Sequence, residues 1–226
     1  MFWKKSGGYG IERDLTLAMF RSSYYTTLSQ VRPDTSKVTF DGQALRFSDY
    51  PFRPASVFPS GAVTAGQVAE VNLESPSQVR LKSGEILFVG HSDKSALLSF
   101  VNRFDVPRRR RLAVWGALLN PFVDTTFTQS EIDGEFHWLE SLGLDRETVT
   151  RWRREVTIAM VAYNFGTMLW DWAGLGLYDV LRAQQAHVGR SEFARFHARA
   201  MTLAALDPPD QSGPATSETK STNGFP

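Results

Sequence analysis

The chain has 226 residues, 42% of them hydrophobic, and its 25 basic and 24 acidic residues leave a formal net charge of +1. This length suffices for one large domain or two small ones, and near-neutrality excludes a global field that would draw the molecule to nucleic acid or an anionic membrane. The lack of cysteine excludes disulfides, thiolate metal sites and cysteine nucleophiles. It fits a reducing compartment, so we expect a cytoplasmic protein.

Residues 1–35 receive no structural assignment from their pattern. Two lysines near the start are not followed by an apolar stretch with a small-residue cleavage site, so we expect no signal peptide. Between residues 11 and 31, the spacing of Ile11 and Leu15 suits a helix, whereas the segment 24–27 suits a strand. Both alternatives stay open.

Residues 36–90 are rich in strand-forming residues and are divided by turns. Asp41-Gly42 and Ser83-Gly84 each stand between alternating apolar runs, which is the pattern of a β-hairpin. We therefore predict an antiparallel β meander with strands in KVTF, ALRFSDY, PASVF, AVTAGQVAEVNL, QVRL and EILFVG.

A short helix is predicted after these strands, with Asp93 as its N-cap and apolar residues at helical spacing: Ala96, Leu97, Phe100, Val101 and Phe104. The stretch QVAEVNLESPSQVRLKSGEILFVGHSDKSALLSFVNRF, several strands closed by one amphipathic helix, resembles the bacterial pleckstrin-homology-like barrels over residues 36–104. The resemblance implies a small barrel or bent sheet that binds mainly peptides, proteins or lipid head groups. Because its first hairpin loop, residues 41–43, lacks the basic cluster of phosphoinositide-binding members, we do not expect lipid head-group binding.

The composition changes near residue 105, where a proline and four arginines, residues 108–111, indicate a domain junction. We divide the chain into four parts: an unassigned segment, 1–35; a β-rich pleckstrin-homology-like domain, 36–106; a helical domain, 107–206; and a disordered tail, 207–226. The predicted class is α+β, an antiparallel β meander or small barrel capped by a helix and followed by a helical domain. Arg108 and Arg109 are candidate phosphate contacts, and a solvated linker is the alternative.

The helical domain carries clear start and stop signals. An apolar segment, LAVWGALLNPF, is predicted to form a short helix that ends before Pro121. Thr128 and Glu131 form a TxxE capping box for a helix that ends near Gly143. Asp145 is then placed to cap the next helix, and a final helix is expected over 190–206.

The run from Arg151 to Leu181 is hydrophobic over most of its helical circumference and carries one narrow polar line. At about 100° per residue, the residues of this line fall within about 60° of its centre, with only Met160 interrupting: Arg153, Thr157, Asn164, Thr167, Asp171, Tyr178, Asp179 and Arg182. A helix of this kind buries most of its surface. We therefore expect one continuous helix over 146–182 as the spine of the helical domain.

Two alternatives to this continuous buried helix are open. Gly174 and Gly176 could end it near Ala173, although the polar line keeps its phase across them. The segment 156–178 is also long enough to cross a membrane, but a charged Asp171 near its middle is costly in lipid. We therefore expect a buried helix and no membrane span.

The polar line contains a candidate polar patch of four residues: Asn164, Thr167, Asp171 and Tyr178. If these side chains faced a cavity, they could bind a ligand through hydrogen bonds, and the pKa of Asp171 could be raised. If they faced water, they would be the outer edge of a mostly buried helix, which is the favoured interpretation.

The segment FHWLESLGLDRETVTRWRR, residues 136–154, resembles a helix-turn-helix of bacterial regulators and transposases, with Gly143 at its turn. The resemblance implies that five residues of the second helix contact DNA bases or phosphates: Arg146, Thr150, Arg151, Arg153 and Arg154. Leu139, however, stands where that motif needs a small residue, and the second helix is unusually long. A simple αα-hairpin with a glycine C-cap and an aspartate N-cap explains the same pattern and is favoured.

Catalytic and metal-binding signatures are lacking in this sequence. Asp133 and His137 could share a helix face, but two ligands do not make a site. We therefore expect no cofactor, no metal and no enzymatic activity. The expected function is that of a protein-binding or adaptor protein with a protein partner or a second copy of itself, and the alternative is a nucleic-acid-binding regulator that uses residues 136–154.

Overall fold

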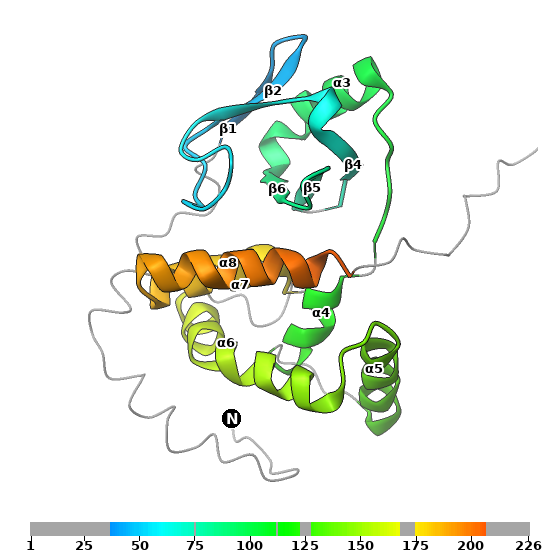
Figure 1. Cartoon of the computed structure of the whole chain (residues 1–226), viewed down its shortest axis with the longest axis vertical. Helices are drawn as coiled ribbons and strands as arrows, with labels where there is room; N and C mark the ends of the chain where they lie inside the picture. Colours follow the sequence, from blue (N-terminus) through cyan, green and yellow to red (C-terminus); the bar gives the residue numbers. More distant parts are fainter. Residues whose placement is uncertain (1–36, 75, 112, 123–127, 168–174, 207–226) are drawn as a thin grey trace, which may run out of the picture.

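The computed structural model describes residues 37–74, 76–111, 113–122, 128–167 and 175–206, and within 164–167 it describes the backbone only. Figure 1 shows the strands and helix α3 in one half of the molecule and helices α4 to α8 in the other. We call these the β half and the helical half. The predicted α+β class is confirmed, whereas the unassigned N-terminal segment and the predicted disordered tail lie outside the described residues.

The β half contains two antiparallel sheets of three strands, in the orders β1-β2-β3 and β4-β5-β6. Their bounds are Lys37–Phe40 for β1, Ala44–Ser48 for β2, Gly61–Thr64 for β3, Val68–Asn72 for β4, Ser77–Leu81 for β5 and Ile86–Val89 for β6. The two predicted hairpins are confirmed, with Gly42 and Gly84 at φ of 92° and 90° in their turns. A 3-10 turn, Ala65–Gln67, carries the chain from the first sheet to the second.

The predicted strand in PASVF is wrong. Residues 49–60, which we call loop 49–60, form turns closed by local hydrogen bonds, such as Ala55 N to Phe52 O at 3.0 Å and Phe58 N to Ala55 O at 3.1 Å. The prolines of this loop lack the N–H group that a strand would use for pairing. Its alternating apolar residues are nonetheless buried, because the loop dips into the core between the two halves.

Helix α3, Lys94–Phe104, is confirmed and packs against β1 and β2. Asp93 occupies the N-cap position, but its carboxylate accepts a hydrogen bond from Val38 N in β1 at 2.7 Å and makes no cap bond to its own helix. The predicted capping contact is therefore replaced by a bond that ties the edge of the first sheet to the start of α3.

The helical half contains α4, Val114–Leu119, α5, Gln129–Ser141, α6, Arg146–Thr167, α7, Leu177–His187, and α8, Arg190–Ala204. The predicted capping box is confirmed: the carboxylate of Glu131 accepts from Thr128 N at 2.7 Å, and Thr128 Oγ1 accepts from Glu131 N at 3.3 Å. Gly143 has a φ of 82°, and Asp145 Oδ1 accepts from Thr148 N at 2.7 Å. The two caps fix the turn from α5 into α6.

The prediction of one continuous helix over 146–182 is wrong. Helix α6 ends at Thr167, and α7 begins at Leu177 with an extended Gly176 as its N-cap. The carboxylate of Asp179 accepts from Gly176 N at 2.9 Å and from the Tyr163 hydroxyl at 3.2 Å. The bond from Gly176 N to Asp179 caps the start of α7, and α7 packs beside α6, so the polar line does not exist as one continuous feature.

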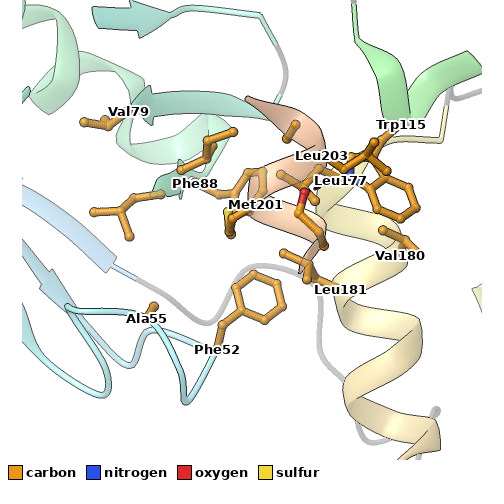
Figure 2. Close-up of a cluster of buried hydrophobic side chains, with 14 of the residues drawn as sticks. Phe52, Ala55, Val79, Phe88, Trp115, Leu177, Val180, Leu181, Met201 and Leu203 are labelled. Atoms are coloured by element: carbon orange, nitrogen blue, oxygen red, sulfur yellow. Dashed lines mark hydrogen bonds between the residues drawn. The ribbon is translucent and has the colours of Figure 1, made fainter. Parts of the chain in front are cut away.

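The two halves share one hydrophobic core. Phe52 of loop 49–60 lies at its centre, with its ring centroid 5.9 Å from that of Phe88 in β6, 5.7 Å from Tyr178 in α7 and 6.4 Å from Phe193 in α8. Figure 2 shows side chains from strands, loop 49–60, α7 and α8 gathered in this cluster, among them Val79, Phe88, Leu177, Leu181 and Met201. Burial of this shared apolar surface holds the halves together.

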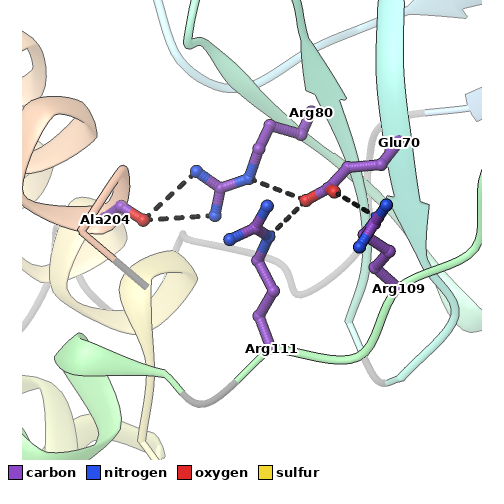
Figure 3. A network of polar contacts seen from close by, with 5 residues as sticks. All are labelled: Glu70, Arg80, Arg109, Arg111 and Ala204. Carbon is purple, nitrogen blue, oxygen red and sulfur yellow. Dashed lines mark hydrogen bonds and ion pairs between the residues drawn. The ribbon is translucent and has the colours of Figure 1, made fainter. Parts of the chain in front are cut away.

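A buried carboxylate adds a polar connection at the edge of this core (Figure 3). Glu70 of β4 is only 7% exposed, and its oxygens lie 3.4 Å from Arg80 Nε and 3.6 Å from Arg109 Nε, with Arg111 Nε also in contact. Arg80 donates two further hydrogen bonds, of 3.2 and 3.1 Å, to the carbonyl of Ala204 at the end of α8. We call these residues the Glu70 cluster.

Replacement of Glu70 by Gln should destabilise the protein strongly, because it removes the carboxylate that lies against the largely buried guanidinium groups of Arg80 and Arg111. We expect a loss of about 3 kcal/mol in the free energy of unfolding, measured by urea denaturation at neutral pH. The matched control is Glu74→Gln, which removes an exposed ion pair with Arg110 and should cost less than about 1 kcal/mol. If Glu70→Gln and Glu74→Gln lost equal stability, the result would contradict the importance of the buried Glu70 cluster for stability.

Candidate interaction surfaces

The arginine run, residues 108–111, lies along the edge of the second sheet. Val71 N donates to Pro107 O and Arg109 N donates to Val71 O, both at 2.9 Å, so that the segment runs parallel to β4. The extended backbone sends alternate side chains to different partners. Arg109 and Arg111 reach Glu70, while Arg110 pairs with Glu74 at 2.8 Å and Arg108 donates to Asn102.

The two candidate phosphate contacts of this run therefore have partners inside the fold. The guanidinium of Arg109 remains about half exposed, and Arg108 is also exposed. The run is thus an ordered edge of the β half with residual positive charge on its outer side. Its role in joining β4 to the helical half was not visible in the sequence, because Glu70 lies some forty positions earlier in the chain.

The α5–α6 hairpin is the segment that resembles a helix-turn-helix. The bulky Leu139 is fully buried between the helices, together with Val149 of α6. The guanidinium of Arg146 lies 4.1 Å from the centroid of the Phe136 ring, and Thr150 Oγ1 donates to the carbonyl of Arg146 at 2.7 Å. Arg146 and Thr150 therefore make contacts within the hairpin itself.

Arg153 also points into the protein. It donates to Leu118 O at 3.1 Å and to Ala117 O at 3.0 Å, both in α4, and it pairs with Glu135 of α5 at 2.5 Å. The side chain is mostly buried. Arg153 thus satisfies carbonyl groups at the C-terminal end of α4, where the helix has no internal donors to offer them.

Arg151 and Arg154 are the two candidate nucleic-acid contacts of α6 that are exposed without a bond to another element. Arg151 makes a hydrogen bond of 3.3 Å to Thr148 on its own helix. Among the candidate residues of the hairpin, Arg146 and Arg153 contact other elements, and Thr150 and Arg151 make hydrogen bonds within α6. The exposed ones are Arg146, Arg151 and Arg154.

Beside these two arginines, α6 and α8 are joined by a surface contact that the sequence did not indicate. The guanidinium of Arg199 lies 5.1 Å from the Trp152 ring and pairs with the carboxylate of Glu155. Trp152 in turn packs against Phe196 of α8, with centroids 6.1 Å apart. The partners lie 44 positions apart in the chain, and no local spacing signals such a pair.

Of the candidate polar patch, only the side chain of Tyr178 belongs to the described residues. The side chains of Asn164 and Thr167, and all of Asp171, lie outside them. Tyr178 faces the core between the halves, with its ring centroid 5.2 Å from that of Phe88. The neighbouring Asp179 is largely buried, and burial raises its pKa despite the hydrogen bonds from Gly176 N and Tyr163 that favour the charged form.

The exposed apolar side chains of the described chain are few. Phe104, Ile132 and Leu206 are 37%, 36% and 40% exposed. Phe104 stands out because its ring contacts Phe40 of β1 and Phe100 of α3, at centroid distances of 6.1 and 5.2 Å. We call Phe104 and the half-buried Phe40 the aromatic surface, which packs on the fully buried Phe100 in the core of the β half.

Among the described residues, no group of three or more side chains of the metal-ligating types lies together, so Asp133 and His137 gain no third ligand. Within the same residues, no helix combines the length and apolar character that crossing a membrane requires.

Comparisons of the chain with protein-family models, with curated proteins and with solved structures found no match. Inferences about function therefore depend on the contacts described above.

Arg153→Ala should destabilise the protein, because it removes hydrogen bonds to two carbonyls of α4 and the ion pair with Glu135. Hydrogen bonds to a charged group contribute about 1.5 to 3 kcal/mol, and we expect a loss of that size in chemical denaturation. Arg151→Ala, on the exposed side of the same helix, is the matched control and should change stability by less than about 0.5 kcal/mol. An Arg153 variant as stable as the control would show that the bonds to α4 contribute little.

Proposed function

We propose that this chain is a non-enzymatic protein-binding or adaptor protein, and that its β half is a pleckstrin-homology-like binding module. The observation that carries the proposal is the aromatic surface. A large aromatic side chain that stays exposed while it packs on another aromatic ring is more informative than scattered exposed aliphatic residues. Aromatic residues are also enriched at the centres of protein interfaces.

The surroundings of Phe104 support this proposal. Asn102, Arg103 and Asp105, its neighbours in the chain, are exposed and polar, so an apolar centre is accompanied by polar groups as at the rim of an interface. Phe40 supplies a half-buried second ring, and its edge-to-face contact with Phe100, at 5.7 Å, holds the surface rigid. A preformed surface loses little conformational entropy when a partner binds.

The arrangement of the β half supports the pleckstrin-homology-like part of the proposal. Two antiparallel sheets are joined through the short turn Ala65–Gln67, and α3 follows the last strand and packs on β1 and β2. One helix therefore closes the meander, as the resemblance implies. In such a module the aromatic surface would lie where the first strand meets the closing helix.

Site-specific photo-crosslinking in cells tests the proposal. A benzophenone amino acid at position 104 should yield one discrete crosslinked protein, whereas the same probe at Ile132, equally exposed but in the helical half, should not yield that product. The purified partner should then bind Phe104→Ala at least about tenfold more weakly than the original chain, corresponding to about 1.4 kcal/mol. Identical products from both positions, or undiminished binding of Phe104→Ala, would contradict the proposal.

A second candidate function is a nucleic-acid-binding regulator, which is favoured by one observation. Arg151 and Arg154 are exposed near the start of α6, directly after the turn of the α5–α6 hairpin. They could contact phosphates even though Arg153 is used within the fold.

Retention on immobilised DNA at low salt tests this second function. If it is correct, the double variant Arg151→Ala with Arg154→Ala should lose retention, and the retention of the original chain should fall steeply as salt is raised, because bound counter-ions are released. A chain that fails to bind DNA at low salt, or a double variant that binds equally well, removes this function.

A further inference from the structure

His197 of α8 is a buried histidine at the contact between the two halves. The residue is only 5% exposed, and its ring centroid lies 6.4 Å from that of Phe52 and 6.0 Å from that of Phe193. Its Nε2 atom has no hydrogen-bond partner. An imidazole in such an apolar setting is accommodated far better neutral than charged.

Gln185 of α7 contacts the same part of loop 49–60. Its Nε2 donates to Pro51 O at 2.8 Å, while its Oε1 atom has no partner. Among the residues that the structure describes, these atoms of His197 and Gln185 are the two buried side-chain polar atoms without a hydrogen bond. The segment Pro51–Phe52 is therefore held by α7 and α8 at a place where polar groups are incompletely satisfied.

Within the part of the chain that the structure describes, the ionisable groups around His197 do not supply a close counter-ion. Glu85, at the β5–β6 turn, favours the charged imidazole, but its carboxylate accepts a hydrogen bond from Ser56 N at 2.9 Å. Tyr50 and Tyr178, on the other sides of Phe52, have phenol groups that stay neutral in acid.

We propose that His197 acts as an acid-sensitive latch between the two halves: its neutral form lets α8 pack on Pro51–Phe52, and its protonation releases that contact. The inference is independent of the proposed protein-binding function. Protonation would place a charge and a second N–H donor beside two phenyl rings, with no acceptor for Nε2 among the described residues. Release of α8 would expose Phe52 and Phe193, so acid would uncover an apolar surface that is closed at neutral pH.

The direction of the pH effect follows from the burial of His197. Burial lowers the pKa of His197 below its ordinary value of 6.5, and the charge of Glu85 only partly offsets this. The unfolded or released form therefore binds a proton more readily than the closed form. The stabilising contribution is complete above the ordinary pKa and is lost progressively as the pH falls below it.

Hydrogen exchange of the full chain at about pH 7.5 and about pH 5, corrected for the intrinsic pH dependence of exchange, tests the latch. We expect several-fold faster exchange at the lower pH for the loop amides of Ala55 and Phe58 and for the amides of α8. Amides in the middle of α6 should not change. The variant His197→Gln should lose this acid response, whereas His137→Gln, at an exposed position of α5, should keep it.

An acid response that persists in His197→Gln, or that is the same throughout the chain, would overturn the proposal. If His197→Gln does not fold, an NMR titration of the imidazoles in the unaltered chain decides instead. A midpoint for His197 below that of exposed His137 supports the latch, and a midpoint equal to or above it overturns the latch.

Discussion

A single buried carboxylate, that of Glu70, organises the polar contacts at the edge of the shared core. It lies against guanidinium groups from β5 and from the arginine run, and through Arg80 it is connected to the last carbonyl of α8. Burial of one negative charge is costly, and here the cost is offset by several charged donors at once. Backbone bonds of Val71 hold residues 107–109 beside β4, so the side chains of Arg109 and Arg111 can reach Glu70, and Arg80 connects this carboxylate to the end of α8.

The apolar core connects the two halves in addition to the Glu70 cluster. Loop 49–60 inserts Phe52 between β6, α7 and α8, so the β half and the helical half are joined by ring contacts as well as by arginines. The aromatic surface at Phe104 lies elsewhere, where α3 meets β1, so the binding proposed there does not require the halves to separate. The buried His197 lies at the contact between the halves, so the proposed binding and the proposed acid response can be tested by separate mutations.

Features set by neighbouring residues were predictable from the sequence. The hairpin turns at Gly42 and Gly84 and the capping box of Thr128 and Glu131 involve partners within a few positions, and the structure confirms them. Features that depend on contacts between residues far apart in the sequence were not predictable. The contacts of Glu70 with the arginine run depend on strand placement. The break before Leu177 depends on a competition between the bond from Gly176 N to Asp179 and continuation of the helix. The phase of the hydrophobic residues does not show which of these is more favourable.

Glu70 and Arg80 act together to join the β half to α8, and a double-mutant cycle measures the coupling between these two side chains. Urea denaturation of Glu70→Gln, Arg80→Gln and the double variant gives the coupling free energy between the two side chains. The structure predicts that the double variant is less destabilised than the sum of the single variants by at least about 1 kcal/mol. Additivity to within about 0.3 kcal/mol would contradict the claim.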